Sequence, residues 1–223
     1  MRDKLYPILH EEIYQTFAKS DRRGYFAAKR LVDLVGAVCG LVLMTPLLGV
    51  VAAMIKIESP KESVFFKQVR IGKDGREFCM FKFRSMCVGA EEKLEELLDQ
   101  NEIEGAMFKM KEDPRITKIG HFIRRHSIDE LPQLWNVLKG DMSLVGPRPP
   151  LPREVDQYTP YDKQRLAVLP GCTGLWQISG RSNLSFDEMV ELDLEYISNA
   201  SVGNDARIIL KTVGVVVGAG DAY

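Results

Sequence analysis

Two adjacent carboxylates with arginines on either side are the part of this sequence best suited to chemistry. Asp129 and Glu130 follow Arg124 by about one helical turn, and Arg148 comes later in a loop flanked by prolines. Arginine binds phosphate oxygens through paired hydrogen bonds, and a hard cation such as Mg²⁺ needs only one or two carboxylates beside the phosphates of a substrate. The combination predicts phosphoryl transfer.

A purely structural interpretation of the same residues stays open at this point. Ser127 and Glu130 have the spacing of a capping box, in which the serine caps a helix and the glutamate returns the bond. Asp129 would then complement the helix dipole. Such a dipole would also lower the pKa of Asp129 and keep it an anionic nucleophile. Both interpretations expect a helix that begins at Ser127.

Composition excludes several classes of protein. At 223 residues the chain can form one ordinary domain, or a modest domain with an anchor. With a formal net charge of -1, nothing in the overall composition indicates a nucleic-acid partner, which would require a basic surface. The cysteines and histidines show no zinc or redox spacing, so we expect a reduced chain without disulfides.

An uncharged apolar run of 22 residues extends from Leu34 to Ile55. As a straight helix it would be about 33 Å long, enough to cross a hydrocarbon core of about 30 Å. Pro46 removes a helix hydrogen bond near the middle, and Thr45 can cover a freed carbonyl. Basic residues lie on both sides of the run, whereas a spanning helix usually has them on one side. A helix that bends at Thr45-Pro46 and returns to the same face explains both features, although a single span kinked at proline stays open.

Turn signals divide the chain that follows the apolar run. Residues 64–86 contain two β-prone segments around Lys73-Asp74-Gly75, which predicts a β-hairpin near the membrane surface. Residues 89–100 combine helix formers with leucines at helical spacing, which predicts an amphipathic helix.

The C-terminal part of the chain is predicted to alternate between helices and glycine-rich or proline-rich loops. A helix is expected over residues 152–169, followed by a glycine-rich loop over residues 170–181. A further helix is expected to begin at Ser185, with a capping box to Glu188.

Three strings of this sequence resemble the bacterial sugar transferase family, the monotopic polyprenyl-phosphate phosphoglycosyl transferases. They are KQVRIGKDGREFCMFKFRSM, DPRITKIGHFIRRHSIDELPQLWNVLKGDMSLVGPRPPLP and PGCTGLWQISGRSN, and the resemblance covers roughly residues 27–223. It implies transfer of a hexose 1-phosphate from a UDP-sugar to undecaprenyl phosphate, with release of UMP. The implied location is the cytoplasmic face of the bacterial inner membrane. Such a reaction would initiate the synthesis of exopolysaccharide, capsule, O-antigen or glycoprotein glycan.

The resemblance also implies roles for the acidic pair and its neighbours. Asp129 would be the nucleophile that forms an aspartyl phosphosugar intermediate, and it would contact Mg²⁺. Glu130 would be its partner, Arg148 would hold a phosphate and Arg124 would support the site. A covalent carboxylate intermediate separates the exchange into two steps, so ping-pong kinetics are expected.

Shorter matches to the family imply the remaining candidates. Lys82 and Arg84 are candidates for the phosphate region, and Gln177 and Arg181 for the region that faces the nucleotide sugar. Thr45-Pro46 matches the break of the family's re-entrant helix, with threonine in place of the usual serine.

The expected fold is α+β and mostly helical, with a re-entrant membrane helix hairpin, interfacial amphipathic helices and a small β-hairpin. The expected divisions are a polar lead over residues 1–26, a membrane anchor over residues 27–58 and a catalytic domain over residues 59–223 on the cytoplasmic face. Two rival functions are an Asp-dependent phosphohydrolase and a membrane-anchored scaffold for glycan enzymes. The sugar, the glycan pathway and the formation of a homo-oligomer are left open.

Overall fold

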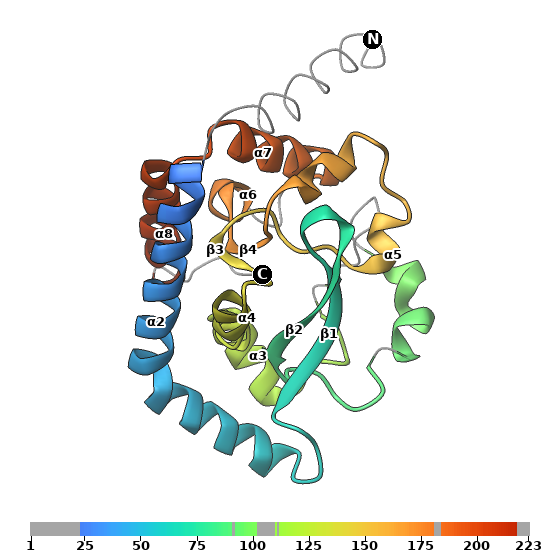
Figure 1. Cartoon of the computed structure of the whole chain (residues 1–223). Helices are drawn as coiled ribbons and strands as arrows, with labels where there is room; N and C mark the ends of the chain where they lie inside the picture. The colour runs from blue at the N-terminus through green and yellow to red at the C-terminus, as the bar shows by residue number, and fades with distance from the viewer. Residues whose placement is uncertain (1–22, 91, 102–109, 111, 181–183, 218–223) are drawn as a thin grey trace.

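The structure of the chain is a computed structural model, which describes residues 23–90, 92–101, 110, 112–180 and 184–217. Helices dominate these residues, and two small sheets accompany them (Figure 1). Strands β1 (Phe65–Ile71) and β2 (Glu77–Phe83) are antiparallel, whereas β3 (Ser143–Val145) and β4 (Gly171–Thr173) are parallel. The prediction of a mostly helical α+β protein is confirmed.

The β1–β2 pair lies where the turn signal predicted it. Its register runs from Phe65 opposite Phe83 to Ile71 opposite Glu77. Asp74 and Gly75 in the turn have φ angles of 57° and 76°, a left-handed conformation that glycine and aspartate tolerate better than most residues. The position of this hairpin relative to a membrane stays a prediction.

The apolar run is part of helix α2 (Arg23–Glu58), which has 36 residues and contains Pro46. Of the described helices, α2 is the one long and apolar enough to cross a membrane. Figure 1 shows that its axis changes direction along its length. The Thr45 hydroxyl donates to the carbonyl of Leu41 at 2.8 Å, a back-bond that bends helices, and Pro46 removes a backbone donor beside it.

Both halves of α2 pack on the rest of the protein. Ala37 is buried in a cluster with Met80 of β2 and Val137. Further along the helix, Val51 and Ile55 are buried in another cluster that includes Phe83. The bent helix therefore follows the surface of the domain over much of its length.

Basic residues before the apolar run bind protein groups. The Lys29 ammonium donates to Asp205 Oδ2 at 3.0 Å and to the carbonyl of Val145 at 2.9 Å. Arg30 donates to the carbonyls of Val137 and Leu138, near the C-terminal end of helix α4 (Gln133–Lys139). These charges hold α2 on the domain, so they are weaker reporters of membrane orientation than the sequence suggested.

The predicted helix start at Ser127 is wrong. Helix α3 (Lys118–Arg125) ends just before it, and a short 3₁₀ turn, η4 (Ile128–Glu130), separates α3 from α4. Ser127 has a φ angle of 54°, and its side chain makes no capping hydrogen bond. The left-handed backbone at this serine breaks the helix, and no capping box forms.

The predicted helix over residues 152–169 is also interrupted. Only α5 (Pro152–Val155) and the 3₁₀ helix η5 (Asp162–Ala167) are present. Between them, Thr159 and Asp162 exchange hydrogen bonds through their side chains and backbone amides at 2.8 and 3.2 Å. This local capping arrangement, together with the restricted backbone of Thr159-Pro160, replaces the continuous helix.

Other segments differ from the expectations in type. The segment 170–181 was predicted to be a loop, but it contains β4 and the short helix α6 (Leu175–Ser179). Residues 89–100 contain a 3₁₀ helix, η3 (Glu92–Gln100), and nothing among the described contacts explains its tight winding. By contrast, α7 (Phe186–Ser198) begins as predicted, with Ser185 and Glu188 in a capping box.

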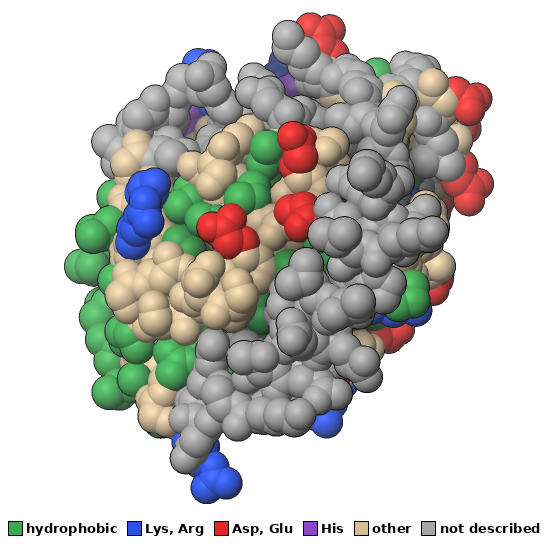
Figure 2. All heavy atoms as spheres, turned by 90° about the horizontal axis from the view of Figure 1, so that it is seen from above, with side chains coloured by type: hydrophobic (Ala, Val, Ile, Leu, Met, Phe, Trp, Pro, Cys, Tyr) green, Lys and Arg blue, Asp and Glu red, His purple; other side chains and the backbone are tan. Residues whose placement is uncertain are grey.

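Exposed hydrophobic side chains concentrate on two neighbouring helices, α2 and α8 (Val202–Val217). Figure 2 views the molecule from above and shows green hydrophobic side chains along the edge where these helices lie, with acidic side chains nearer the centre. An apolar face of this kind suits contact with lipid. Its exposed members include Leu31, Val35, Val38, Val42, Leu43, Val50 and Ile57 on α2, with Val202, Leu210 and Val213 on α8.

Candidate active site

Glu130 is bound to a lysine from the β-hairpin. Lys82 Nζ of β2 lies 2.6 Å from Glu130 Oε1 of η4. The two residues are 48 positions apart in the chain, so only the packing of the hairpin against η4 brings them together. This pair takes the place of the bond that a capping box would have required from Glu130.

Asp129 is nearly buried, and its side chain is 7% exposed. Burial raises the pKa of Asp129 to about 6, and the positive charges of Lys82 and Arg124 offset only part of this effect. The expectation of a lowered pKa is therefore wrong. Desolvation outweighs the helix dipole because η4 is a single short turn and not the start of a regular helix. Asp129 is still ionised at neutral pH, but it is more basic than an ordinary aspartate.

The pKa of Glu130 moves the other way. Burial raises it, but the Lys82 ammonium and more distant arginines outweigh burial and hold the pKa of Glu130 below its usual range. Adjacent carboxylates whose pKa values are pushed apart can take different roles in one reaction. Here Asp129 is the more basic member and Glu130 the more acidic one.

Arg148 is positioned by a buried carboxylate. Its guanidinium lies 3.9 Å from Glu154 Oε1, and Glu154 is 2% exposed. Glu154 also accepts a hydrogen bond from the backbone of Leu151 at 2.9 Å. One carboxylate thus holds both the proline-rich loop and the arginine that projects from it.

Arg70 of β1 adds a second guanidinium that is almost fully buried. It donates to the carbonyl of Pro149 at 2.9 Å and to the side chain of Gln68 at 2.7 Å. Burial lowers the pKa of Arg70 to about 9, and repulsion from Arg148 acts in the same direction. A negatively charged ligand would relieve both effects.

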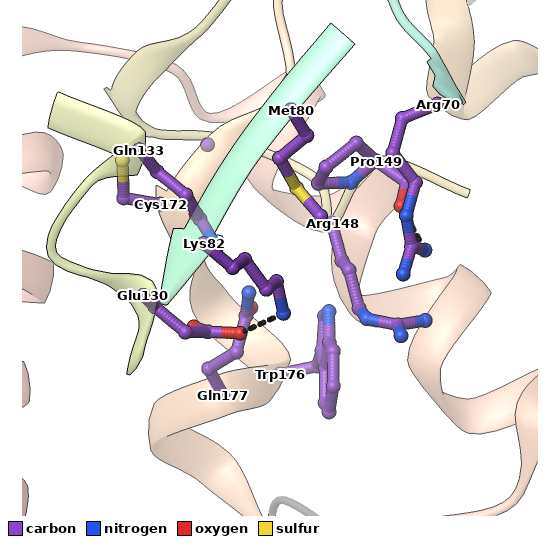
Figure 3. A pocket seen from close by; sticks show the side chains of 11 residues that line it. Arg70, Met80, Lys82, Glu130, Gln133, Arg148, Pro149, Cys172, Trp176 and Gln177 are labelled. Atoms are coloured by element: carbon purple, nitrogen blue, oxygen red, sulfur yellow. Dashed lines mark hydrogen bonds and ion pairs between the residues drawn. The ribbon is translucent and has the colours of Figure 1, made fainter. Parts of the chain in front are cut away.

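Of the side chains described above, Arg70, Lys82, Glu130 and Arg148 line a cavity of about 100 Å³. Ligand pockets for molecules of drug size usually measure about 300–1,000 Å³, so this cavity suits a group of phosphate size and not a whole nucleotide sugar. Figure 3 shows Lys82, Arg148 and Trp176 converging on it. The lining residues are Arg70, Met80, Lys82, Glu130, Gln133, Arg148, Pro149, Gly171, Cys172, Trp176 and Gln177.

The residues present fit a cation only if the substrate supplies further ligands. The described part of the chain contains no group of three or more His, Cys, Asp or Glu side chains arranged for a metal ion. Asp129, which is 7% exposed, supplies one carboxylate next to the cavity-lining Glu130. One such carboxylate, completed by substrate phosphates, is enough for Mg²⁺.

A family model described as bacterial sugar transferase matches residues 24–219. The chain belongs to the bacterial sugar transferase family. It is 50% identical over 196 residues to the galactosyl transferase CpsE of Streptococcus agalactiae serotype III (strain NEM316), an alignment that covers 86% of this chain and 43% of CpsE. It is 42% identical to the undecaprenyl-phosphate galactose phosphotransferase of Salmonella typhimurium, over 87% of this chain and 41% of that protein.

This sugar transferase chain spans less than half the length of those two relatives. It matches 85% of the exopolysaccharide production protein ExoY of Rhizobium meliloti, with 41% identity over 193 residues. The match to the family extends over nearly the whole chain. The reaction and the substrates of this chain are proposed below.

The structure brings together four of the site residues that the sequence singled out. Lys82, Glu130, Arg148 and Gln177 all line the cavity of this sugar transferase. Asp129 lies next to Glu130 in η4 but is not among the lining residues.

The other predicted site residues lie elsewhere. Arg84 donates to the carbonyl of Ser63 at 2.8 Å and lies 3.8 Å from Glu62, so it holds the connection between α2 and β1 and does not reach the cavity. Arg124 is outside the lining, although its charge acts on Asp129. Arg181 lies outside the described residues.

Two lining residues of the sugar transferase site, Arg70 and Trp176, were not predicted from the sequence. The strand register contained a signal for Arg70: Gln68 faces Met80, so Arg70, Met80 and Lys82 share one face of the hairpin. Trp176 carried no comparable signal, because α6 was expected to be a loop.

Proposed function

We propose that this chain transfers a hexose 1-phosphate from a UDP-sugar to undecaprenyl phosphate, with Asp129 as the nucleophile. The observation that carries the proposal is a desolvated, basic carboxylate beside a cavity of phosphate size lined by cationic side chains. The similarity to the undecaprenyl-phosphate galactose phosphotransferase of Salmonella typhimurium supports the same reaction.

The proposed chemistry proceeds in two displacements at one phosphorus atom. A carboxylate oxygen of Asp129 attacks the phosphorus that carries the sugar, and the bond from this phosphorus to the UMP oxygen breaks. UMP leaves, and an aspartyl phosphosugar remains. An oxygen of undecaprenyl phosphate then attacks the same phosphorus, which releases the Asp129 carboxylate and forms the lipid-linked diphosphate sugar.

The other residues bind and orient the phosphates. Arg148 and Arg70 present guanidinium groups at the cavity, and each can bind two oxygens of one phosphate. Lys82 keeps Glu130 ionised through their ion pair. We propose that Asp129 also contacts Mg²⁺, which would neutralise charge on the phosphate oxygens.

For the membrane, we propose that α2 enters the bilayer and returns to the cytoplasmic face. Contacts at both ends of the helix support this. Near its start, Lys29 binds Asp205 of α8, and at its end Glu58 accepts a hydrogen bond from the backbone of Lys118 at 3.0 Å. A straight span would separate these ends by about the full thickness of the bilayer, whereas here both ends contact one domain.

Cysteine labelling tests this membrane arrangement. In a chain without its natural cysteines, single cysteines at Gly24 and Lys67 should react with a membrane-impermeant reagent from the same face. A side chain at Gly24 would meet no atom within 4 Å, so this change should be tolerated. Labelling from opposite faces would contradict the re-entrant arrangement.

The reaction is tested on protein held in nanodiscs with Mg²⁺, a panel of UDP-sugars and undecaprenyl phosphate. UMP release with one sugar, lost in Asp129→Asn and retained in Asp74→Asn, would support the proposal. Asp74 is a suitable control because it is exposed in the hairpin turn, where its left-handed backbone also suits asparagine.

Omission of the acceptor separates the rival functions. A transferase with a covalent intermediate should release about one equivalent of UMP per active site and then stop. Continuous UMP release without acceptor would instead indicate a phosphohydrolase. A folded protein that releases no UMP with any sugar would support the scaffold.

A further inference from the structure

The indole nitrogen of Trp176 is a buried donor without an acceptor among the described residues. The side chain is 9% exposed, and Nε1 is shielded from solvent with no hydrogen-bond partner. An indole N–H can only donate, so no rearrangement of its own proton satisfies it. A buried donor left in this state destabilises the folded protein.

The position of Trp176 indicates what would satisfy this donor. Trp176 lines the same cavity as Arg70, Lys82 and Arg148, and Figure 3 shows the indole nitrogen on the side of the ring nearest Lys82 and Arg148. The cavity therefore receives donors from four side chains on three different segments, namely the β-hairpin, the proline-rich loop and α6.

The cavity is lined by more cationic than anionic side chains: Arg70, Lys82 and Arg148 against Glu130. The acidic lining residue, Glu130, is already bound to Lys82 at 2.6 Å. A ligand that matches the site must then carry several acceptor oxygens on one small centre. A phosphoryl group meets this requirement, and the cavity of about 100 Å³ has room for one.

We infer that Trp176 Nε1 donates a hydrogen bond to a phosphate oxygen of the substrate and is a specific ligand-binding residue of this site. The inference rests on the proposed function and adds to it an uncharged donor of fixed direction. Arginine and lysine bind the charge of the phosphate through flexible side chains. The rigid indole would fix which oxygen faces α6.

The test is the Trp176→Phe variant, which keeps an aromatic ring and removes the N–H. Trp135→Phe is the matched control, because Trp135 is the other of the two tryptophans, is 54% exposed on α4 and does not line the cavity. In the Trp135→Phe protein, emission from Trp176 alone also reports ligand binding directly.

Binding is measured for UMP, a UDP-sugar and farnesyl phosphate, a short analogue of the lipid acceptor. Loss of a hydrogen bond to a charged acceptor should weaken binding roughly 10- to 100-fold in Trp176→Phe and leave Trp135→Phe unchanged. Weakening for UMP and the UDP-sugar alone would assign the bond to the donor substrate. Weakening for farnesyl phosphate alone would assign it to the acceptor substrate, and weakening for all three to a phosphate position that both occupy.

Thermal unfolding without ligand separates a binding role from a structural one. Because the N–H has no partner in the ligand-free protein, Trp176→Phe should unfold within about 2–4 °C of the parent, equivalent to about 1 kcal/mol. A much larger decrease, with ligand affinity unchanged in the folded fraction, would overturn the inference.

The inference and the proposed function fail in different ways. If the parent protein binds these ligands and Trp176→Phe binds them equally well, the assignment of Trp176 is wrong and the proposed function stands. If the parent protein binds none of them and releases no UMP, the proposed function is wrong, and so is the inference about Trp176.

Discussion

Replacing Asp129 by asparagine should make the ligand-free protein more stable above pH 6. Burial raises the pKa of this carboxylate from its usual value of 3.8 to about 6, so the folded state disfavours the ionised form. The stability associated with the protonated group is fully present below pH 4 and is lost as the pH rises through 6. Asparagine has nearly the same shape and no charge, so the variant does not lose stability as the pH rises through this range.

The size of the effect follows from the shift. A change of about two pKa units corresponds to about 3 kcal/mol, at about 1.4 kcal/mol for each unit. For a protein of this size, 1 kcal/mol changes the midpoint of thermal unfolding by roughly 2–4 °C, so Asp129→Asn should unfold roughly 6–12 °C higher at pH 8. The difference between variant and parent should shrink steadily toward pH 4.

The assay is thermal unfolding in one detergent across pH 4–8, followed by tryptophan fluorescence. A chelator is included, since a bound cation would stabilise the carboxylate and hide the effect. Asp74→Asn, at an exposed turn, is the control and should follow the parent at every pH. An Asp129→Asn midpoint at or below that of the parent at pH 8, with no dependence on pH, would refute the argument that burial makes Asp129 basic.

Three further substitutions test other contacts. Lys82→Met should lower kcat/KM on the order of 100-fold. It should also move the acidic limb of the pH profile to higher pH, because Lys82 holds the pKa of Glu130 down. Lys82→Arg should recover part of the activity and part of the pH shift. Lys29→Met should lower the free energy of unfolding by about 3–5 kcal/mol, since it leaves Asp205 charged and buried without its ion-pair partner. The double variant Lys29→Met with Asp205→Asn should lose less stability than Lys29→Met alone. Gly171→Ala should lower the free energy of unfolding by about 1–3 kcal/mol or prevent folding, because its Cβ would lie 2.1 Å from the backbone nitrogen of Gly146, just beyond β3. Normal expression and an unchanged unfolding midpoint would contradict this close approach.

Features that depend on neighbouring residues were predictable. The β-hairpin formed around Lys73-Asp74-Gly75, and α7 began at Ser185 with its capping box. The apolar run became a long helix with Pro46 inside. In each case the decisive interaction spans only a few positions, so the sequence contains it directly.

Local patterns failed where distant segments compete with them. The Ser127–Glu130 spacing favoured a capping box, but Lys82, which is 48 positions away from Glu130, binds the glutamate instead. The same holds for the glycine-rich segment predicted as a loop. Gly171 pairs with Ser143 in a parallel sheet, which places α6 and Trp176 at the cavity.

The sequence by itself determined which groups are available for chemistry: an acidic pair, basic residues spread along the chain and an apolar helix with a proline. It also determined the family, through strings long enough to exclude coincidence. Only the tertiary structure decided that Asp129 is basic, that Arg70 and Trp176 face the same cavity as Arg148, and that both ends of α2 contact one domain. The reason is that pKa values, donor sites and cavities depend on burial and on contacts between distant segments, which no local spacing specifies.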